Sequence, residues 1–188
     1  MMRIFKSARL GALACGLFVG LSPALAPAAG ADDLIHELKV GALYHDMPSL
    51  WSGFQREDKS VDINIDAQLS PSMQLFFGTV RPAVGASIST AGQTSSAYVD
   101  ARWTYEAASG LFFATGLGIA IHDGSLVNDD RTRKALGSRE LFHIPIELGY
   151  RLDTHTSVSA YFEHMSNAYT QRYNQGLDRL GIRYGYRF

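Results

Sequence analysis

Two polar residues near the end of one predicted strand carry the side chains that an ester-cleaving reaction needs. His164 and Ser166 are two residues apart, so on a strand they project from the same face, within reach of a hydrogen bond. They continue the apolar row formed by Val158, Ala160 and Phe162. A hydroxyl beside an imidazole can act as a nucleophile next to its base.

A carboxylate in phase with this pair leads into the next predicted strand. Asp178 begins the row that continues with Leu180 and Ile182, and a single hairpin would place it on the same outer face near His164. Serine, histidine and a carboxylate have the roles that acyl transfer requires. The alternative is structural, because strand ends near a membrane interface often carry polar residues. The alternation of residues along the strands, taken alone, leaves both the catalytic and the structural interpretation open.

The elements that must position these residues are strands. Alternation of apolar and polar residues runs through almost the whole chain after residue 30 and is strict at residues 61–69. No segment with helical period competes with it. The predicted strands, all within a single domain at residues 31–188, are 34–45, 57–70, 73–90, 95–107, 110–123, 138–153, 155–166 and 176–188.

The first thirty residues predict an export signal. Arg3, Lys6 and Arg9 precede the apolar stretch 10–21, and small residues follow as far as Gly30. This is the order of a secretory signal peptide. The single cysteine, Cys15, falls inside this segment, so the mature chain is expected to have no disulfide. A lipoprotein site at Cys15 is the alternative, although the apolar stretch before it is too short.

The side to which the apolar rows point decides between a soluble barrel and a membrane barrel, which has an apolar exterior and a polar lumen. Three features favour the membrane form. The predicted strands have about ten residues or more, as a tilted crossing requires, and their polar rows carry charges of both signs. Aromatic residues also lie near the predicted strand ends, as in an interfacial girdle: Tyr44, Trp51, Trp103, Tyr105, Tyr150 and Tyr186.

We therefore predict an all-β fold, an eight-stranded antiparallel transmembrane β-barrel of the outer-membrane type. The chain ends on Phe188, in phase with Tyr184 and Tyr186. This ending resembles the terminal signal of bacterial outer-membrane barrels, so the barrel-assembly machinery is an expected partner through Phe188. Eight antiparallel strands can close without leaving a free edge.

Loop lengths predict the orientation of the barrel. The connections near 71–72, 107–109 and 153–155 are short, and those at 46–56, 123–137 and 167–175 are longer. Short turns face the periplasm and long loops face outward. The third outer loop carries basic residues that are either solvated or in contact with lipopolysaccharide phosphates: Arg131, Arg133 and Lys134.

Composition excludes several classes of protein. A net charge of −1 argues against nucleic acid as a partner. With 46% hydrophobic residues, the chain is not expected to be disordered. The remaining histidines are scattered without the spacing of metal ligands, so neither a metal site nor a cofactor is expected: His36, His45, His122, His143 and His155.

Three segments together carry a family resemblance: 164–168 (HMSNA), 174–178 (NQGLD) and 184–188 (YGYRF). They strongly resemble the PagL-type lipid A 3-O-deacylases, and the similarity extends upstream to segments at 81–88, 116–124 and 136–139. These are eight-stranded outer-membrane barrels of Gram-negative bacteria that hydrolyse the ester-linked acyl chain at the 3-position of lipid A. The resemblance thus implies lipopolysaccharide as substrate, an outer-membrane location and a homodimer.

The resemblance also implies a role for each site residue. Ser166 matches the nucleophile, His164 the base, Asp178 the acid, and Asn174 an asparagine of the oxyanion hole. The best-known pattern has glutamate in place of Asp178. Since aspartate is one methylene shorter, the strand pairing must bring it closer to the imidazole. Asn167 either donates to substrate or shapes the hairpin.

The leading hypothesis is an outer-membrane serine esterase acting on lipid A. A second hypothesis is a non-catalytic small barrel that adheres or stabilises the membrane. A third, a secreted soluble lipid-binding barrel, predicts extraction without detergent. Replacing Ser166 would inactivate only the enzyme.

Overall fold

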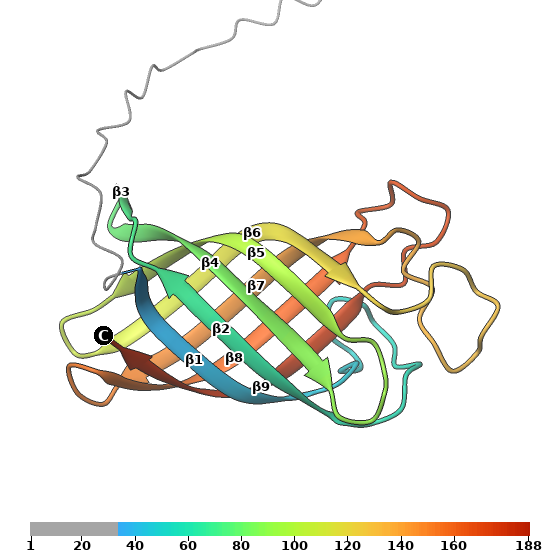
Figure 1. Cartoon of the computed structure of the whole chain (residues 1–188), viewed down its shortest axis with the longest axis horizontal. Helices are drawn as coiled ribbons and strands as arrows, with labels where there is room; N and C mark the ends of the chain where they lie inside the picture. The colour runs from blue at the N-terminus through green and yellow to red at the C-terminus, as the bar shows by residue number, and fades with distance from the viewer. Residues whose placement is uncertain (1–33) are drawn as a thin grey trace, which may run out of the picture.

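The computed structural model describes residues 34–188. The expected signal peptide, residues 1–30 with Cys15, lies outside the described residues. The described chain forms a β-barrel of long strands with loops at both ends (Figure 1). Within this part of the chain, no helix is long and apolar enough to span a bilayer. The strands are β1 (Ile35–Tyr44), β2 (Val61–Leu69), β3 (Met73–Leu75), β4 (Gly78–Ser89), β5 (Ser96–Glu106), β6 (Leu111–His122), β7 (Glu140–Arg151), β8 (Thr156–Ser166) and β9 (Leu177–Arg187).

Eight of these strands close the barrel, as the sequence predicts. From β4 to β9 each strand pairs antiparallel with the next, β9 pairs with β1, β1 with β2, and β2 with β4. Each of the eight barrel strands therefore has a neighbour on both sides, and β3 is a short addition beside β4. Closure removes the free edges that an open sheet would expose.

The barrel has an apolar exterior and a polar interior. In β2, Asp62 and Asp66 are buried, while the alternate residues Ile63 and Ile65 are exposed. A soluble barrel has the opposite arrangement, because water favours charges outside. The exposed apolar rows suit contact with lipid, and the prediction of a barrel of the outer-membrane type is confirmed.

Paired charges fill the interior. The Lys39 ammonium lies 3.0 Å from a carboxylate oxygen of Glu147, and the Arg183 guanidinium binds the same carboxylate. Further along, Arg102 forms an ion pair with Asp100 at 2.8 Å. All five side chains are buried. Buried charges are tolerated when they are paired and hydrogen-bonded, so the interior is a packed polar core.

The prediction of one continuous strand at residues 73–90 is wrong. The chain reverses between β3 and β4, with Phe76 in the left-handed region at φ 53°. The indole N–H of Trp103 donates to the Leu75 carbonyl at 3.1 Å. The indole ring packs against Gly78, where a Cβ would overlap it. Alternation continues through both arms of a hairpin, so periodicity does not reveal this reversal.

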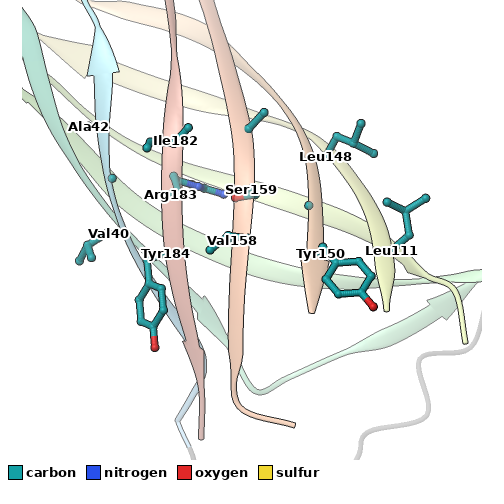
Figure 2. A pocket seen from close by; sticks show the side chains of 13 residues that line it. Val40, Ala42, Leu111, Leu148, Tyr150, Val158, Ser159, Ile182, Arg183 and Tyr184 are labelled. Carbon is teal, nitrogen blue, oxygen red and sulfur yellow. The ribbon is translucent and has the colours of Figure 1, made fainter. Parts of the chain in front are cut away.

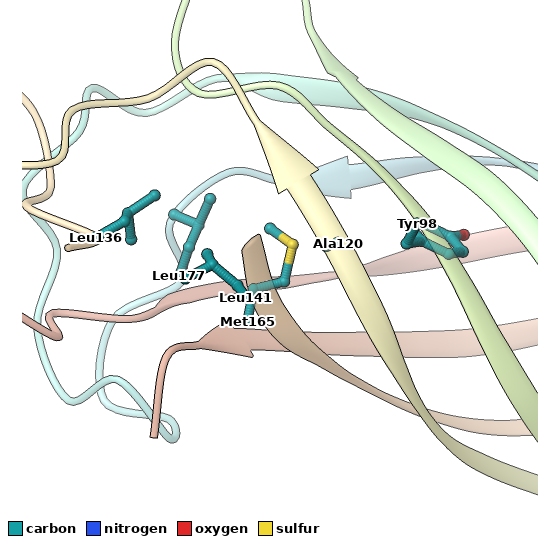
Figure 3. Packing of buried hydrophobic residues seen from close by; sticks show 6 residues of the cluster. All are labelled: Tyr98, Ala120, Leu136, Leu141, Met165 and Leu177. Atoms are coloured by element: carbon teal, nitrogen blue, oxygen red, sulfur yellow. The ribbon is translucent and has the colours of Figure 1, made fainter. Parts of the chain in front are cut away.

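The three longest connections lie at one end of the barrel, and the short turns 107–110 and 152–155 lie at the other (Figure 1). The connections at the first end are outer loop 1 (residues 45–60), the shorter outer loop 2 (90–95), outer loop 3 (123–139) and outer loop 4 (167–176). Beneath them lies a buried apolar cluster in which Leu136 of outer loop 3 packs with Leu141, Met165 and Leu177 (Figure 3). The outer loops therefore form a packed cap next to the ends of β7, β8 and β9.

Candidate active site

The register of β8 and β9 brings three predicted site residues together. His164 and Asp178 are directly opposite each other across the two strands. His164 Nδ1 lies 2.6 Å from Asp178 Oδ1, and His164 Nε2 lies 3.0 Å from Ser166 Oγ. Because a carboxylate only accepts hydrogen bonds, Nδ1 carries a hydrogen, which leaves Nε2 of a neutral imidazole to accept the Ser166 hydroxyl.

Direct cross-strand pairing explains how an aspartate reaches the imidazole. Opposite residues of an antiparallel pair have Cβ atoms about 4.5–5.5 Å apart, so the shorter side chain suffices. Asp178 is fully buried and His164 is 5% exposed. Ser166 is half-buried and lines a hollow of about 340 Å³ that also borders His164. The Ser166 hydroxyl therefore faces an accessible space, while its two hydrogen-bonded partners are shielded from water.

Outer loop 1 covers this arrangement from the outside of the barrel. The Trp51 indole stacks on the His164 ring with 4.6 Å between centroids and 15° between planes. The backbone N–H of Ser52 donates to Asp178 Oδ2 at 2.6 Å, and that of Met47 donates to the Asp178 carbonyl at 2.8 Å. Asp178 is thus held through both carboxylate oxygens and its backbone.

Sequence reasoning misses these loop contacts. The aromatic pattern predicts Trp51 as part of an interfacial girdle, but the structure places it against His164. Nothing in the sequence singles out Ser52. Outer loop 1 forms no strand, so the alternation that identifies the partners on β8 and β9 gives no information on which loop residue reaches them.

The two asparagines that the sequence singles out have different environments. Asn174 lines the same hollow as Ser166, and its Oδ1 accepts the backbone N–H of Asn167 at 2.9 Å. The NH₂ group of Asn174 is then the part of the side chain that is available to a ligand. The Asn167 amide is buried and donates to the carbonyls of Leu136 and Tyr173 at 2.8 and 2.6 Å. Of its two interpretations, the structure supports shaping of the hairpin.

Outer loop 4 turns sharply just after Ser166. Ala168 and Tyr169 are both left-handed, with φ of 51° and 62°. This conformation is costly for residues that have a Cβ. Gly176 completes the loop at φ 63°, where a Cβ would lie 3.2 Å from His164 Cε1. The tight path returns Asn174 to the side of Ser166.

A larger hollow, of about 640 Å³, lies on the lipid-facing wall, where apolar side chains such as Val158 and Leu148 surround it (Figure 2). Ala160 is one of its small lining residues. A neighbouring hollow shares Ala160 and Ile182 with it and reaches Met47 and Pro48 of outer loop 1. Neither contains His164, Ser166 or Asp178. Both lie beside β8, whose outer row ends at His164 and Ser166, so an apolar surface follows the barrel wall toward the candidate site.

Several histidines and acidic residues of the described chain bind other side chains or backbone groups. Among residues 34–188, no group of three or more His, Cys, Asp or Glu side chains is placed to hold a metal ion. His143 instead lies between Asp100 and Glu163, at 3.2 and 3.3 Å. The expectation that the protein uses neither a metal nor a cofactor stays a prediction.

Comparisons with known proteins agree on the fold. A family model described as "Lipid A 3-O-deacylase (PagL)" matches residues 41–187. The crystal structure of the outer membrane enzyme PagL is similar at a TM-score of 0.58 and 20% identity, covering 78% of this chain and 97% of that one. Neisserial surface protein A matches at a TM-score of 0.50 and 10% identity, with 81% and 96% covered. No curated protein matches the sequence significantly.

Proposed function

Because the chain belongs to the PagL family of lipid A 3-O-deacylases, we propose that it is an outer-membrane serine esterase that removes the 3-O-acyl chain of lipid A. The carrying observation is the hydrogen-bonded chain Ser166–His164–Asp178 on the outer wall of the barrel. A buried carboxylate that orients an imidazole, itself bonded to a hydroxyl, has the parts of a serine-hydrolase triad.

Acylation follows from the hydrogen-bond directions. The Ser166 Oγ attacks the carbonyl carbon of the ester as His164 Nε2 takes the hydroxyl proton. Asp178 accepts from Nδ1–H and stabilises the resulting imidazolium. When the tetrahedral intermediate collapses, the bond from the carbonyl carbon to the sugar 3-oxygen breaks. Nε2 returns its proton to that oxygen, which leaves a 3-hydroxyacyl ester on Ser166.

Deacylation reverses the roles. A water molecule gives a proton to His164 Nε2 and attacks the acyl-enzyme carbonyl. The bond to Ser166 Oγ then breaks, and the serine recovers its proton. The products are a free 3-hydroxy fatty acid and the deacylated lipid. The hollow of about 340 Å³ beside outer loops 1 and 4 offers water a way to Ser166.

The Asn174 side chain is the proposed oxyanion donor. Its Oδ1 is occupied by the Asn167 N–H, which aims the NH₂ group elsewhere in the hollow shared with Ser166. A preorganised N–H directed at the developing negative charge lowers the barrier by about 3–4 kcal/mol in other serine hydrolases.

The position of Ser166 suits a substrate embedded in the outer leaflet. The candidate site lies at the end of β8 that adjoins the long loops. The outward-facing residues of β8 continue from the site along an apolar wall. We infer that the scissile ester meets Ser166 in the plane of the membrane while its acyl chain lies along the hollows around Ala160. Lipid A then reacts without leaving the bilayer.

The deciding experiment is mass spectrometry of lipid A from a Gram-negative host that expresses the unaltered chain or Ser166→Ala. We expect the loss of one 3-hydroxyacyl unit with the unaltered chain only. Heat-modifiable mobility on gels verifies that both proteins are folded barrels. Deacylation by Ser166→Ala would refute the serine mechanism, and unchanged lipid A with both folded proteins would favour a non-catalytic barrel.

A further inference from the structure

Lys134 of outer loop 3 is buried, although it lies among basic residues predicted to be solvated or to bind phosphate. Its side chain has no exposed surface. The ammonium donates to Ser52 Oγ at 3.0 Å, forms an ion pair with Asp46 Oδ1 at 2.6 Å and lies 4.6 Å from the centre of the Phe54 ring. All three partners belong to outer loop 1, so for Lys134 both earlier interpretations are wrong.

Ser52 links this lysine to the proposed triad. The hydroxyl oxygen of Ser52 accepts from Lys134, and the backbone N–H of the same residue donates to Asp178 Oδ2 at 2.6 Å. Asp178 continues the chain to His164. Two hydrogen bonds, joined through the covalent frame of Ser52 itself, therefore connect an ammonium in outer loop 3 to the carboxylate that holds the imidazole beside Ser166.

We propose that Lys134 is a positioning residue for the reaction: it anchors Ser52 so that the Ser52 N–H fixes the second carboxylate oxygen of Asp178. This inference rests on the proposed serine mechanism. Outer loop 1 forms no strand, so the sheet does not place that N–H. With Oδ2 released, the carboxylate would rotate about its own Cβ–Cγ bond, and the hydrogen bond to His164 Nδ1 would weaken.

A purely structural role for Lys134 makes a different prediction. Its ion pair with Asp46 joins outer loops 1 and 3 without touching Asp178. If that pair were its whole role, Lys134→Met would lower stability and would leave each folded molecule fully reactive. The two roles separate in a double-mutant cycle with Ser52→Ala, which removes the hydroxyl and keeps the N–H.

The test uses purified, folded full-length barrel in lipid–detergent micelles. Two rates are measured: release of 3-hydroxy fatty acid from lipid A, as kcat and KM, and labelling of Ser166 by a fluorophosphonate. The final extent of labelling gives the number of molecules with a competent Ser166. The rate of labelling reports the alignment of the triad, because this reaction does not depend on the acyl substrate. Lys59→Met, at an exposed lysine of outer loop 1, is the matched control.

We expect Lys134→Met and Ser52→Ala each to lower kcat and the labelling rate about 10-fold to 100-fold per competent molecule, with KM little changed. The double variant should be no slower than Lys134→Met alone, because both changes break one link. Lys59→Met should match the unaltered chain.

Three outcomes would overturn the proposal: additive losses in the double variant, an unchanged labelling rate in Ser52→Ala, or no labelling of the unaltered chain. If Lys134→Met does not fold, Ser52→Ala decides alone through its labelling rate. An unaltered chain that is labelled but releases no fatty acid would refute lipid A as substrate. The labelling rates would still decide on Lys134.

Discussion

Asp178 is constrained in two ways, because strand pairing fixes its backbone and outer loop 1 fixes its carboxylate. One oxygen accepts from His164 and the other from the Ser52 N–H, each at 2.6 Å. The Trp51 indole covers the same imidazole. A space bounded on these sides is fitted to the length of an aspartate.

At this scale we predict that Asp178→Glu lowers deacylation at least about 10-fold, although the best-known family pattern has glutamate here. The added methylene moves the carboxylate away from its position opposite His164 and toward Ser52, and small misplacements of catalytic groups are costly. The rate of fatty-acid release measures the effect, with Asp58→Glu in outer loop 1 as control. An equal or faster rate would mean that outer loop 1 readily adapts to the longer side chain.

Strand periodicity predicts site residues only where they lie on strands, and the loop residues Asn167 and Asn174 come from the family resemblance. Ser166, His164 and Asp178 share the parity of β8 and β9, and the structure brings them into one chain of hydrogen bonds. Ser52 and Lys134 lie in outer loops, and Ser52 contacts Asp178 while Lys134 contacts Ser52. Their neighbours depend on how the whole cap packs, and no periodicity encodes that.

Among the elements, outer loop 1 is fixed by a carboxylate at its far end. Glu57 is buried and accepts from His45 Nε2 and the Thr94 N–H, both at 2.9 Å, and from the Lys134 N–H at 3.1 Å. These donors come from three different outer loops or their borders. Burial alone would raise the pKa of Glu57, but hydrogen bonds from His45 and Thr94 outweigh it and bring the pKa to about 2.

This predicts an acid limit for the cap. The Glu57 pKa falls from 4.5 to about 2 on folding, so its contribution of about 3 kcal/mol is complete above pH 4.5 and is lost as the pH falls toward 2. His45 adds an upper limit. Burial works to lower its pKa, but hydrogen bonds to Asp62 and Glu57 raise it above 6.5, and that stabilisation is lost as the pH rises through the raised value.

Hydrogen exchange of residues 45–60 between pH 3 and pH 9 checks both limits. Protection should be greatest between about pH 4.5 and 6.5, and Glu57→Gln should remove the acid limb. Asp58→Asn, at an exposed neighbour, should leave the curve unchanged. A curve for Glu57→Gln that matches the unaltered chain would contradict the assignment.

The wall formed by β8 and β9 carries a prediction about the acyl chain. Ala160 borders both apolar hollows, so Ala160→Trp should fill the surface on which the chain is proposed to lie. We expect KM for long-chain lipid A to rise, while fluorophosphonate labelling of Ser166 stays normal. Val99→Trp, at an exposed residue of β5 outside both hollows, is the control. Unchanged kinetics with Ala160→Trp would place the acyl chain elsewhere.

Strand prediction from the sequence succeeds where one face of each strand meets lipid and the other meets the polar core. The expected strand at 57–70 begins only at Val61, because Glu57 binds within the cap. The hairpin of β3 and β4 escapes prediction, since both arms alternate and the reversal at Phe76 depends on local packing against Trp103.

For the whole molecule, the ion-pair core replaces the apolar core of a soluble domain. Glu147 forms ion pairs with both Lys39 and Arg183 and accepts the Ser159 hydroxyl at 2.6 Å. Glu147 is the nearest carboxylate to both cations, since Glu37 lies 3.9 Å from Lys39 and Asp66 lies 3.7 Å from Arg183. Removing one partner of a buried ion pair costs about 3–5 kcal/mol, because the remaining charge stays buried.

We predict that Glu147→Gln lowers the temperature at which the barrel loses its compact mobility on gels. Glu140→Gln, at the exposed start of β7, should not change it. At temperatures where both are folded, labelling of Ser166 should be normal, since Glu147 lies in the interior. An unaltered melting temperature in Glu147→Gln would mean that the two cations find other partners. Assembly through Phe188 and a homodimer stay predictions.

The Ser166 hydroxyl lies on the wall of the barrel instead of in its lumen, and this position has a kinetic consequence. On the proposed function, encounters occur by lateral diffusion in two dimensions, so the rate depends on the mole fraction of lipid A in the membrane and little on its bulk concentration. Diluting lipid A with inert phospholipid at constant total substrate should slow turnover in proportion. The fatty acid is likewise delivered into the bilayer, where it accumulates beside the enzyme that made it.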